Sequence, residues 1–182
     1  ELLEMAKPEK RERYMQRLKA SADRLHVMIE DVLMFSQLNL YTRPDILEAS
    51  DLNALIEGRV TVWRTLSEAH HLTLELDLAH DLPHVRIDGE LFAHALTRLV
   101  TNAINYTPAG TVTISTARLS EGEQPWGTIS VADTGPGIEP DHLPHIFQRF
   151  YRADESRTTN DESGLGLAIA KSLVEAHGGT IT

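Results

Sequence analysis

Three segments of the chain carry residue types that could bind a phosphorylated purine. The first, residues 129–138, alternates as a strand and then reads Asp-Thr-Gly-Pro-Gly from Asp133. If its apolar residues face a core, the period of two turns the Asp133 carboxylate to the same side. There it needs a donor, such as an adenine amine. Gly135 and Gly137 lack a Cβ and would let a ligand approach the backbone closely. The same residues also fit a plain strand that ends in an Asp-Thr-Gly turn.

The second segment, residues 98–108, belongs to a strongly periodic stretch over 89–107 that predicts a helix. Asn102 and Tyr106 are four residues apart and therefore share one edge of that helix. The amide oxygen of Asn102 could bind Mg²⁺, which prefers oxygen ligands and keeps substrate phosphates in its shell. Tyr106 could pack against a ring or donate a hydrogen bond to a phosphate. An asparagine at a helix edge is also compatible with simple hydration.

The third segment, residues 163–179, has Gly164 and Gly166 at the start of a predicted helix. Free amide N–H groups and the helix dipole can hold phosphate at such a position. The segment is neither a dinucleotide fingerprint, because Ile169 replaces the third glycine, nor a Walker loop, because Gly-Lys-Ser/Thr is missing. The polar stretch before it could place Arg152 or Arg157 over phosphates, or could be an ordinary surface loop.

The composition restricts the classes of function. The chain has 182 residues and a formal net charge of −10, which disfavours nucleic-acid binding because phosphate neutralisation needs clustered Lys and Arg. The absence of cysteine excludes disulfides and suits a reducing, cytoplasmic location. None of the nine histidines has neighbours that complete a metal-ligand set. No apolar run reaches the roughly 18–20 residues of a membrane span, so we expect no membrane contact by this chain.

The N-terminal part of the chain differs from the rest. Residues 1–40 contain apolar side chains three or four apart, and they predict the end of one helix, a turn and a long amphipathic bundle helix. The spacing is carried by Leu18, Ala22, Leu25, Ile29 and Val32. Such a helix needs partners to cover its apolar face. Residues 41–50 are predicted to form a linker.

The remaining elements, which must position the three segments, are predicted from periodicity over residues 51–182. Helices are expected over residues 51–69, 89–107 and 164–177, and strands over 71–77, 85–88, 111–119 and 128–133. This order indicates an α/β fold, a two-layer sandwich with a mixed sheet rather than a wound parallel sheet. We also expect a short helix near 141–148, core anchoring by Phe147 and Phe150, and a last strand after Gly179 that the chain truncates.

Taken in order, these motifs resemble the histidine-kinase catalytic domain. Asn102 with Tyr106, then residues 133–137, 147–150 and 164–167, are similar to its N box, first glycine box, F box and second glycine box. Residues 16–38 resemble the second helix of the dimerisation and phosphotransfer domain. The resemblance implies a Bergerat fold that binds ATP and Mg²⁺. It also implies adenine recognition at Asp133 above a floor of Gly135 and Gly137, Mg²⁺ at Asn102, and a lid end that Gly164 and Gly166 bend around the phosphates. Ile138, Leu165 and Leu167 are the further ATP-binding residues that it implies.

The same resemblance implies a protein histidine kinase that dimerises through its stalk helices. In that family a histidine on the first stalk helix takes the γ-phosphate of ATP and passes it to an aspartate of a response-regulator receiver domain. The acceptor lies in a His-Glu/Asp-Leu-Arg-Thr-Pro type motif, and no histidine of this chain has that neighbourhood. We expect the acceptor to precede this chain.

Three positions depart from the family pattern. Arg98 stands where a second Asn is frequent, Asn105 where Lys is frequent, and Asp161-Glu162 replaces a glycine-rich approach. Arg98 and Asn105 could contact phosphates, or Arg98 could repel Mg²⁺ and leave a degenerate regulatory module without kinase activity. A Bergerat ATPase of the type II topoisomerase or mismatch-repair kind would need a Glu base where Arg98 stands, and is disfavoured.

Overall fold

A computed structural model describes most of the chain. It covers residues 47–121, 124–153 and 163–182, together with residues 11, 12, 14, 15, 18, 19, 21, 22, 25, 28, 29, 31, 33 and 34. All described residues between 11 and 34 have helical conformation. As continuous elements, the predicted stalk over 1–40 and the linker before Leu47 lie outside the described residues.

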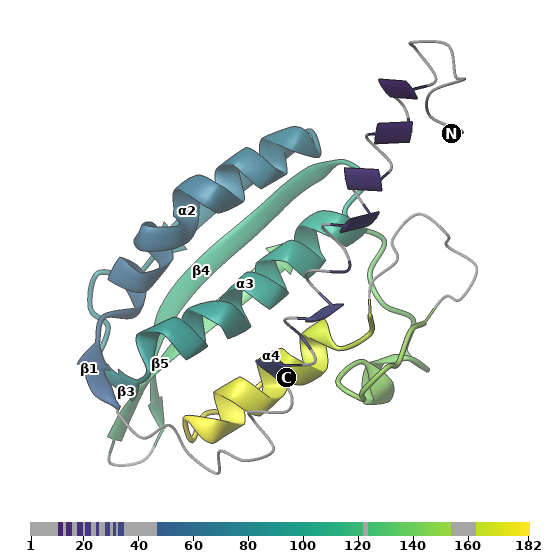
Figure 1. The fold of residues 1–182 in the computed structure, drawn as a ribbon. Coiled ribbons are helices and arrows are strands. Elements are labelled where there is room, and N and C mark those ends of the chain that lie inside the picture. The colour runs from purple at the N-terminus through teal and green to yellow at the C-terminus, as the bar shows by residue number, and fades with distance from the viewer. Residues whose placement is uncertain are drawn as a thin grey trace.

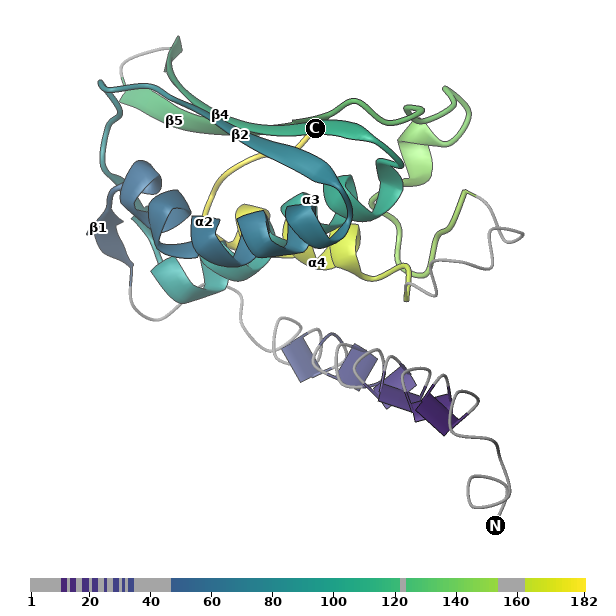
Figure 2. The ribbon, with the colours of Figure 1, turned by 90° about the horizontal axis from the view of Figure 1, so that it is seen from above.

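The central sheet has three strands in the order β2 (Leu72–Leu78), β4 (Gly110–Glu121) and β5 (Gln124–Asp133). β2 runs parallel to β4, whereas β4 and β5 are antiparallel. Three helices, α2 (Leu52–Ala69), α3 (Gly89–Tyr106) and α4 (Gly166–Ala176), lie on one side of this sheet (Figures 1 and 2). The predicted two-layer α/β sandwich with a mixed sheet is confirmed.

Two aspartates begin the longer helices. Asp51 precedes α2, and its carboxylate accepts hydrogen bonds from the backbone N–H groups of Asn53 and Ala54. Asp88 precedes α3 and accepts from the N–H of Leu91. Both carboxylates satisfy donors that the first turn of a helix leaves without partners. Each cap therefore helps to fix the residue at which its helix begins.

Helix α3 is packed on two sides. Its residues Leu96, Val100 and Ile104 belong to an apolar cluster with α2 and the sheet, where Trp63, Val112 and Ile114 are also buried. On another side, Ala95 joins a second cluster with Leu165, which precedes α4, and with Ile169, Ala170 and Leu173 of α4. Met34, from the helical N-terminal residues, packs against this second cluster. Figure 2 shows those residues beyond the helical layer, away from the sheet.

The structure differs from the predicted elements in four places. A short strand β1 (Glu48–Ser50) pairs antiparallel with β3 (Val85–Ile87), inside the segment predicted to be a linker. The predicted helix near 141–148 contains only a 3₁₀ turn, η1 (Leu143–His145), with a proline in its first positions. Residues 180–182 form no strand. Phe150 is 71% exposed, so the prediction that it anchors to the core was wrong.

In the part of the chain that the structure describes, no helix combines the length and the apolar character that crossing a membrane requires.

Candidate functional site

Asp133, the last residue of β5, lies on the face of the sheet that the helices cover. It pairs with Val112 across the antiparallel ladder, and Val131 pairs with Ile114. Val112 and Ile114 are fully buried, and directly opposed residues of an antiparallel pair point to the same face. The direction predicted for Asp133 is therefore confirmed. Because the residue ends its strand, its carboxylate remains exposed, with Oδ1 accepting from the Gly135 N–H at 2.8 Å.

Gly135 brings the turn after β5 against the end of α3. A Cβ built on Gly135 would lie 2.7 Å from Asp133 Oδ1 and 3.0 Å from the carbonyl oxygen of Tyr106. Real Cβ atoms essentially never come closer than 3.0 Å to a heavy atom outside their own residue and its two neighbours in the chain. A side chain at this position would therefore displace the Asp133 carboxylate and shift the turn slightly away from α3, so glycine allows the close contact. The contact joins the first predicted segment to the second.

Asn102 and Tyr106 occupy the last two turns of α3, close to this contact. Asn102 is half-buried, and its side chain has no hydrogen-bond partner among the described residues. Tyr106 is 42% exposed. A half-buried amide oxygen without a protein partner fits one ligand position of Mg²⁺. Among the described residues, no group of three His, Cys, Asp or Glu side chains could hold a metal ion.

The third segment approaches the site at the start of α4. Gly164 has a φ of +68°, and a Cβ there would lie 2.9 Å from the carbonyl carbon of Phe150. Its carbonyl oxygen accepts from the Phe150 N–H at 2.9 Å, so the two segments are held together by their backbones. Leu165 is 3% exposed and packs in the core. Only its backbone could touch a ligand, and its N–H already donates to Ser163 Oγ.

Gly166, the first residue of α4, lies beside α3. A Cβ on Gly166 would be 3.8 Å from Cδ of Arg98, which is one helical turn before Asn102. The start of α4 and the turn after β5 therefore both contact the second half of α3. Around these contacts, Ile138 is 45% exposed, and Asn105, Arg152 and Leu167 are half-buried. Gly137 has a φ of +76° and open space around it. Arg157 lies outside the described residues.

The guanidinium of Arg98 points toward the N-terminal helical residues. Its Nη2 lies 2.5 Å from Oδ1 of Asp31, in the helical N-terminal residues. Oδ2 of Asp31 accepts from Ser163 Oγ at 3.0 Å. Sequence reasoning identified neither Asp31 nor Ser163. One signal was available, because Asp31 shares a helix face with the half-buried Met28 and Met34 at three-residue spacing.

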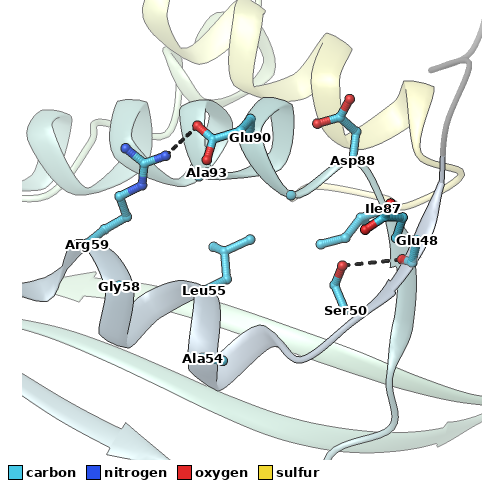
Figure 3. Close-up of a pocket in the computed structure, with 11 residues that line it drawn as sticks. Glu48, Ser50, Ala54, Leu55, Gly58, Arg59, Ile87, Asp88, Glu90 and Ala93 are labelled. Carbon is cyan, nitrogen blue, oxygen red and sulfur yellow. Dashed lines mark hydrogen bonds and ion pairs between the residues drawn. The ribbon is translucent and has the colours of Figure 1, made fainter.

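A separate pocket lies at the other end of α3 (Figure 3). It has a volume of about 730 Å³ and lies between β1, the first half of α2 and the first turns of α3. Three carboxylates, Glu48, Asp88 and Glu90, line it together with one cation, Arg59, which pairs with Glu90 at 2.6 Å. An excess of negative charge repels polyphosphate. The charge of this pocket therefore disfavours a polyphosphate ligand.

Residues 87–182 match the family of histidine kinase-, DNA gyrase B- and HSP90-like ATPases. The sensor protein IrlS of Burkholderia pseudomallei is 35% identical over 97% of this chain, and the sensor histidine kinase TrcS of Mycobacterium tuberculosis is 34% identical over 91%. The chain spans only 38% and 32% of these two relatives. It therefore corresponds to about a third of each.

Two solved structures of similar fold align with most of this chain. Full-length ShkA in complex with AMPPNP aligns with a TM-score of 0.76 and 29% identity, over 97% of this chain and 36% of that one. The histidine kinase AdeS of Acinetobacter baumannii aligns with a TM-score of 0.70 and 27% identity, over 92% of this chain and 75% of that one.

Proposed function

The chain belongs to the family of histidine kinase-, DNA gyrase B- and HSP90-like ATPases, and on this basis we propose that it is the ATP-binding catalytic region of a sensor histidine kinase. The sensor kinases among its relatives support this assignment within the family. The observation that carries it is the contact at Gly135. That contact places the Asp133 carboxylate beside the end of α3, where Asn102 has an amide without a partner in the described part of the chain.

The chain's own residues would bind and orient ATP. Asp133 accepts a hydrogen bond from the adenine amine through the carboxylate that the Gly135 N–H orients. Asn102 supplies an oxygen ligand to Mg²⁺, which when bound neutralises charge on the phosphates. Further contacts are proposed for the remaining site residues, namely Asn105, Tyr106, Gly135, Gly137, Ile138, Arg152, Arg157, Gly164, Leu165, Gly166 and Leu167. Such a site acts by holding the γ-phosphate in place for attack.

The phosphoryl acceptor would be a histidine outside this chain, on the helix preceding the stalk segment. We propose that residues 1–40 are part of a dimerisation stalk, 41–50 the junction and 51–182 the catalytic domain. The exposed apolar side chains of the N-terminal helical residues support dimerisation, because they require partner helices. They are Tyr14, Met15, Leu18, Leu25, Ile29 and Leu33. A cytoplasmic response-regulator receiver domain would take the phosphoryl group from the histidine.

The ion pair of Arg98 weakens the alternative of a degenerate regulatory module. That alternative depended on an uncompensated cation near the Mg²⁺ site. The guanidinium of Arg98 instead pairs with the carboxylate of Asp31, so its charge is balanced.

The proposal is tested in two steps on the whole chain. Isothermal titration with ATP should show binding that strengthens when Mg²⁺ is added. Incubation with a first-helix fragment that carries the acceptor motif should then give acid-labile phosphate on that fragment. A fragment whose histidine is replaced by Gln serves as the control. Mg²⁺-dependent binding without transfer would refute the kinase assignment, and no binding at all would refute the nucleotide site.

A further inference from the structure

Side chains from three distant parts of the chain meet at Asp31. Its Oδ1 lies 2.5 Å from Arg98 Nη2 on α3, and its Oδ2 accepts from Ser163 Oγ at 3.0 Å. Asp31 is 2% exposed, and the Arg98 side chain is 22% exposed. A carboxylate that is buried this deeply is costly unless it is paired and hydrogen-bonded. Arg98 and Ser163 therefore stabilise the N-terminal helical residues in their position against the domain.

This cluster is continuous with the proposed phosphate-binding segment. Ser163 immediately precedes Gly164, and its Oγ also accepts from the N–H of Leu165 at 3.2 Å. Arg98 lies against Gly166, and Asn102 follows it by one turn of α3. The residues that hold the N-terminal helical residues in place, Arg98 and Ser163, thus lie respectively on α3, the helix proposed to carry the Mg²⁺ ligand, and at the start of α4.

We propose that Asp31, Arg98 and Ser163 form an intramolecular clamp, and that Asp31 keeps Arg98 away from the nucleotide phosphates. The proposal rests on the proposed function, because it deepens the role of that site. The pair with Asp31 occupies Nη2 of Arg98, so a movement of that nitrogen to a phosphate would break the pair. Phosphate and Asp31 therefore compete for Arg98, which acts as a positioning residue.

The competition couples the stalk to nucleotide binding in both directions. When a phosphate takes Arg98, the buried Asp31 carboxylate loses its ion pair with Arg98, and the docked position of the N-terminal helical residues is weakened. By thermodynamic linkage, any force that moves this helix away from α3 must strengthen nucleotide binding by the same factor. A signal that reaches the chain through its stalk would thereby change the ATP affinity.

The docked position can be measured as a distance within one chain. The sequence has no cysteine, so spin labels attach only at introduced sites, Lys19→Cys on the exposed N-terminal helical face and Val62→Cys on α2. Labelled chain is diluted with unlabelled chain, and the distance distribution is recorded by pulsed electron spin resonance without nucleotide. Asp31→Asn and Arg98→Met, which are close to the native side chains in size, should both broaden the distribution. Glu175→Gln, which removes an exposed ion pair with Lys171 on α4, should not.

ATP titrations of the same variants test the competition for Arg98. Asp31→Asn should raise the ATP affinity by about fivefold or more, a usual size for coupling between two sites. Arg98→Met should show no gain, and neither should the double variant. A gain that persists in the double variant would come from the lost negative charge alone and would overturn the competition, as would an unchanged affinity of Asp31→Asn. An unchanged distance distribution in either single variant overturns the clamp. If the parent chain binds no ATP, the proposed function fails, while the distances still decide the clamp.

Discussion

Replacing Gly135 with alanine tests whether the contact between the β5 turn and α3 builds the nucleotide site. The new Cβ would start 2.7 Å from Asp133 Oδ1 and 3.0 Å from the Tyr106 carbonyl oxygen. Ordinary contact requires the turn to retreat by roughly 0.5 Å. The retreat strains the hydrogen bond from the Gly135 N–H, whose loss costs about 1 kcal/mol of folding stability.

The effect on ATP should be larger than the effect on folding. A hydrogen bond to a charged acceptor contributes about 1.5–3 kcal/mol, and the displaced Asp133 would no longer meet the adenine amine. The expected loss of ATP affinity is therefore about 10-fold to 100-fold. Titration calorimetry measures the affinity, and urea denaturation measures the stability.

Gly58→Ala provides a matched control. Gly58 lies inside α2, and a Cβ there would meet nothing within 4 Å. The substitution should stabilise the helix by about 0.5–1 kcal/mol and leave ATP binding unchanged. If Gly135→Ala binds ATP as tightly as Gly58→Ala, the proposed role of the contact is wrong.

Three further predictions concern the site itself. Asp133→Ala should abolish ATP binding and leave the circular dichroism spectrum unchanged, because the carboxylate is exposed and stabilises no core contact; normal ATP titration would exclude adenine recognition by Asp133. Asn102→Ala should make ATP affinity independent of Mg²⁺, since the ion loses its protein ligand; titrations with and without Mg²⁺ that still differ would contradict this. The chain alone should not autophosphorylate, because no histidine has the acceptor neighbourhood; acid-labile label after incubation with radiolabelled ATP would disprove it.

Local patterns predicted most of the domain. The apolar periodicity of residues 51–69 and 89–107 placed α2 and α3 within one residue of their observed ends. Period-two alternation also placed Asp133 on the correct face of the sheet. Helix periodicity and strand alternation depend on residues that are close in the sequence, so they can be recognised from the sequence alone. Strand β1 could not be predicted in this way, because Glu48–Ser50 is only three residues long and has no large apolar side chain. It exists through its pairing with β3.

The environment of Arg98 could not be predicted either, because it depends on contacts with residues that are distant in the sequence. Its sequence neighbours give its place on a helix, but its role depends on Asp31 and Ser163, which only the folded chain brings near. The error at Phe150 is similar. Its backbone has a φ of +61° and donates to Gly164, so the residue is fixed by its main chain while its ring faces solvent.

The parallel pairing of β2 and β4 has one further consequence. Parallel neighbours can be joined only by a chain that leaves the sheet and returns, and here the return path includes α3. The helix proposed to bind the nucleotide is thus also part of the crossover connection between β2 and β4. A ligand bound between α3 and β5 would contact both the sheet and the connection between its strands. Its binding free energy would therefore add to the free energy of unfolding of the whole domain. Removal of the nucleotide would then make the whole domain easier to unfold, including parts far from the ligand.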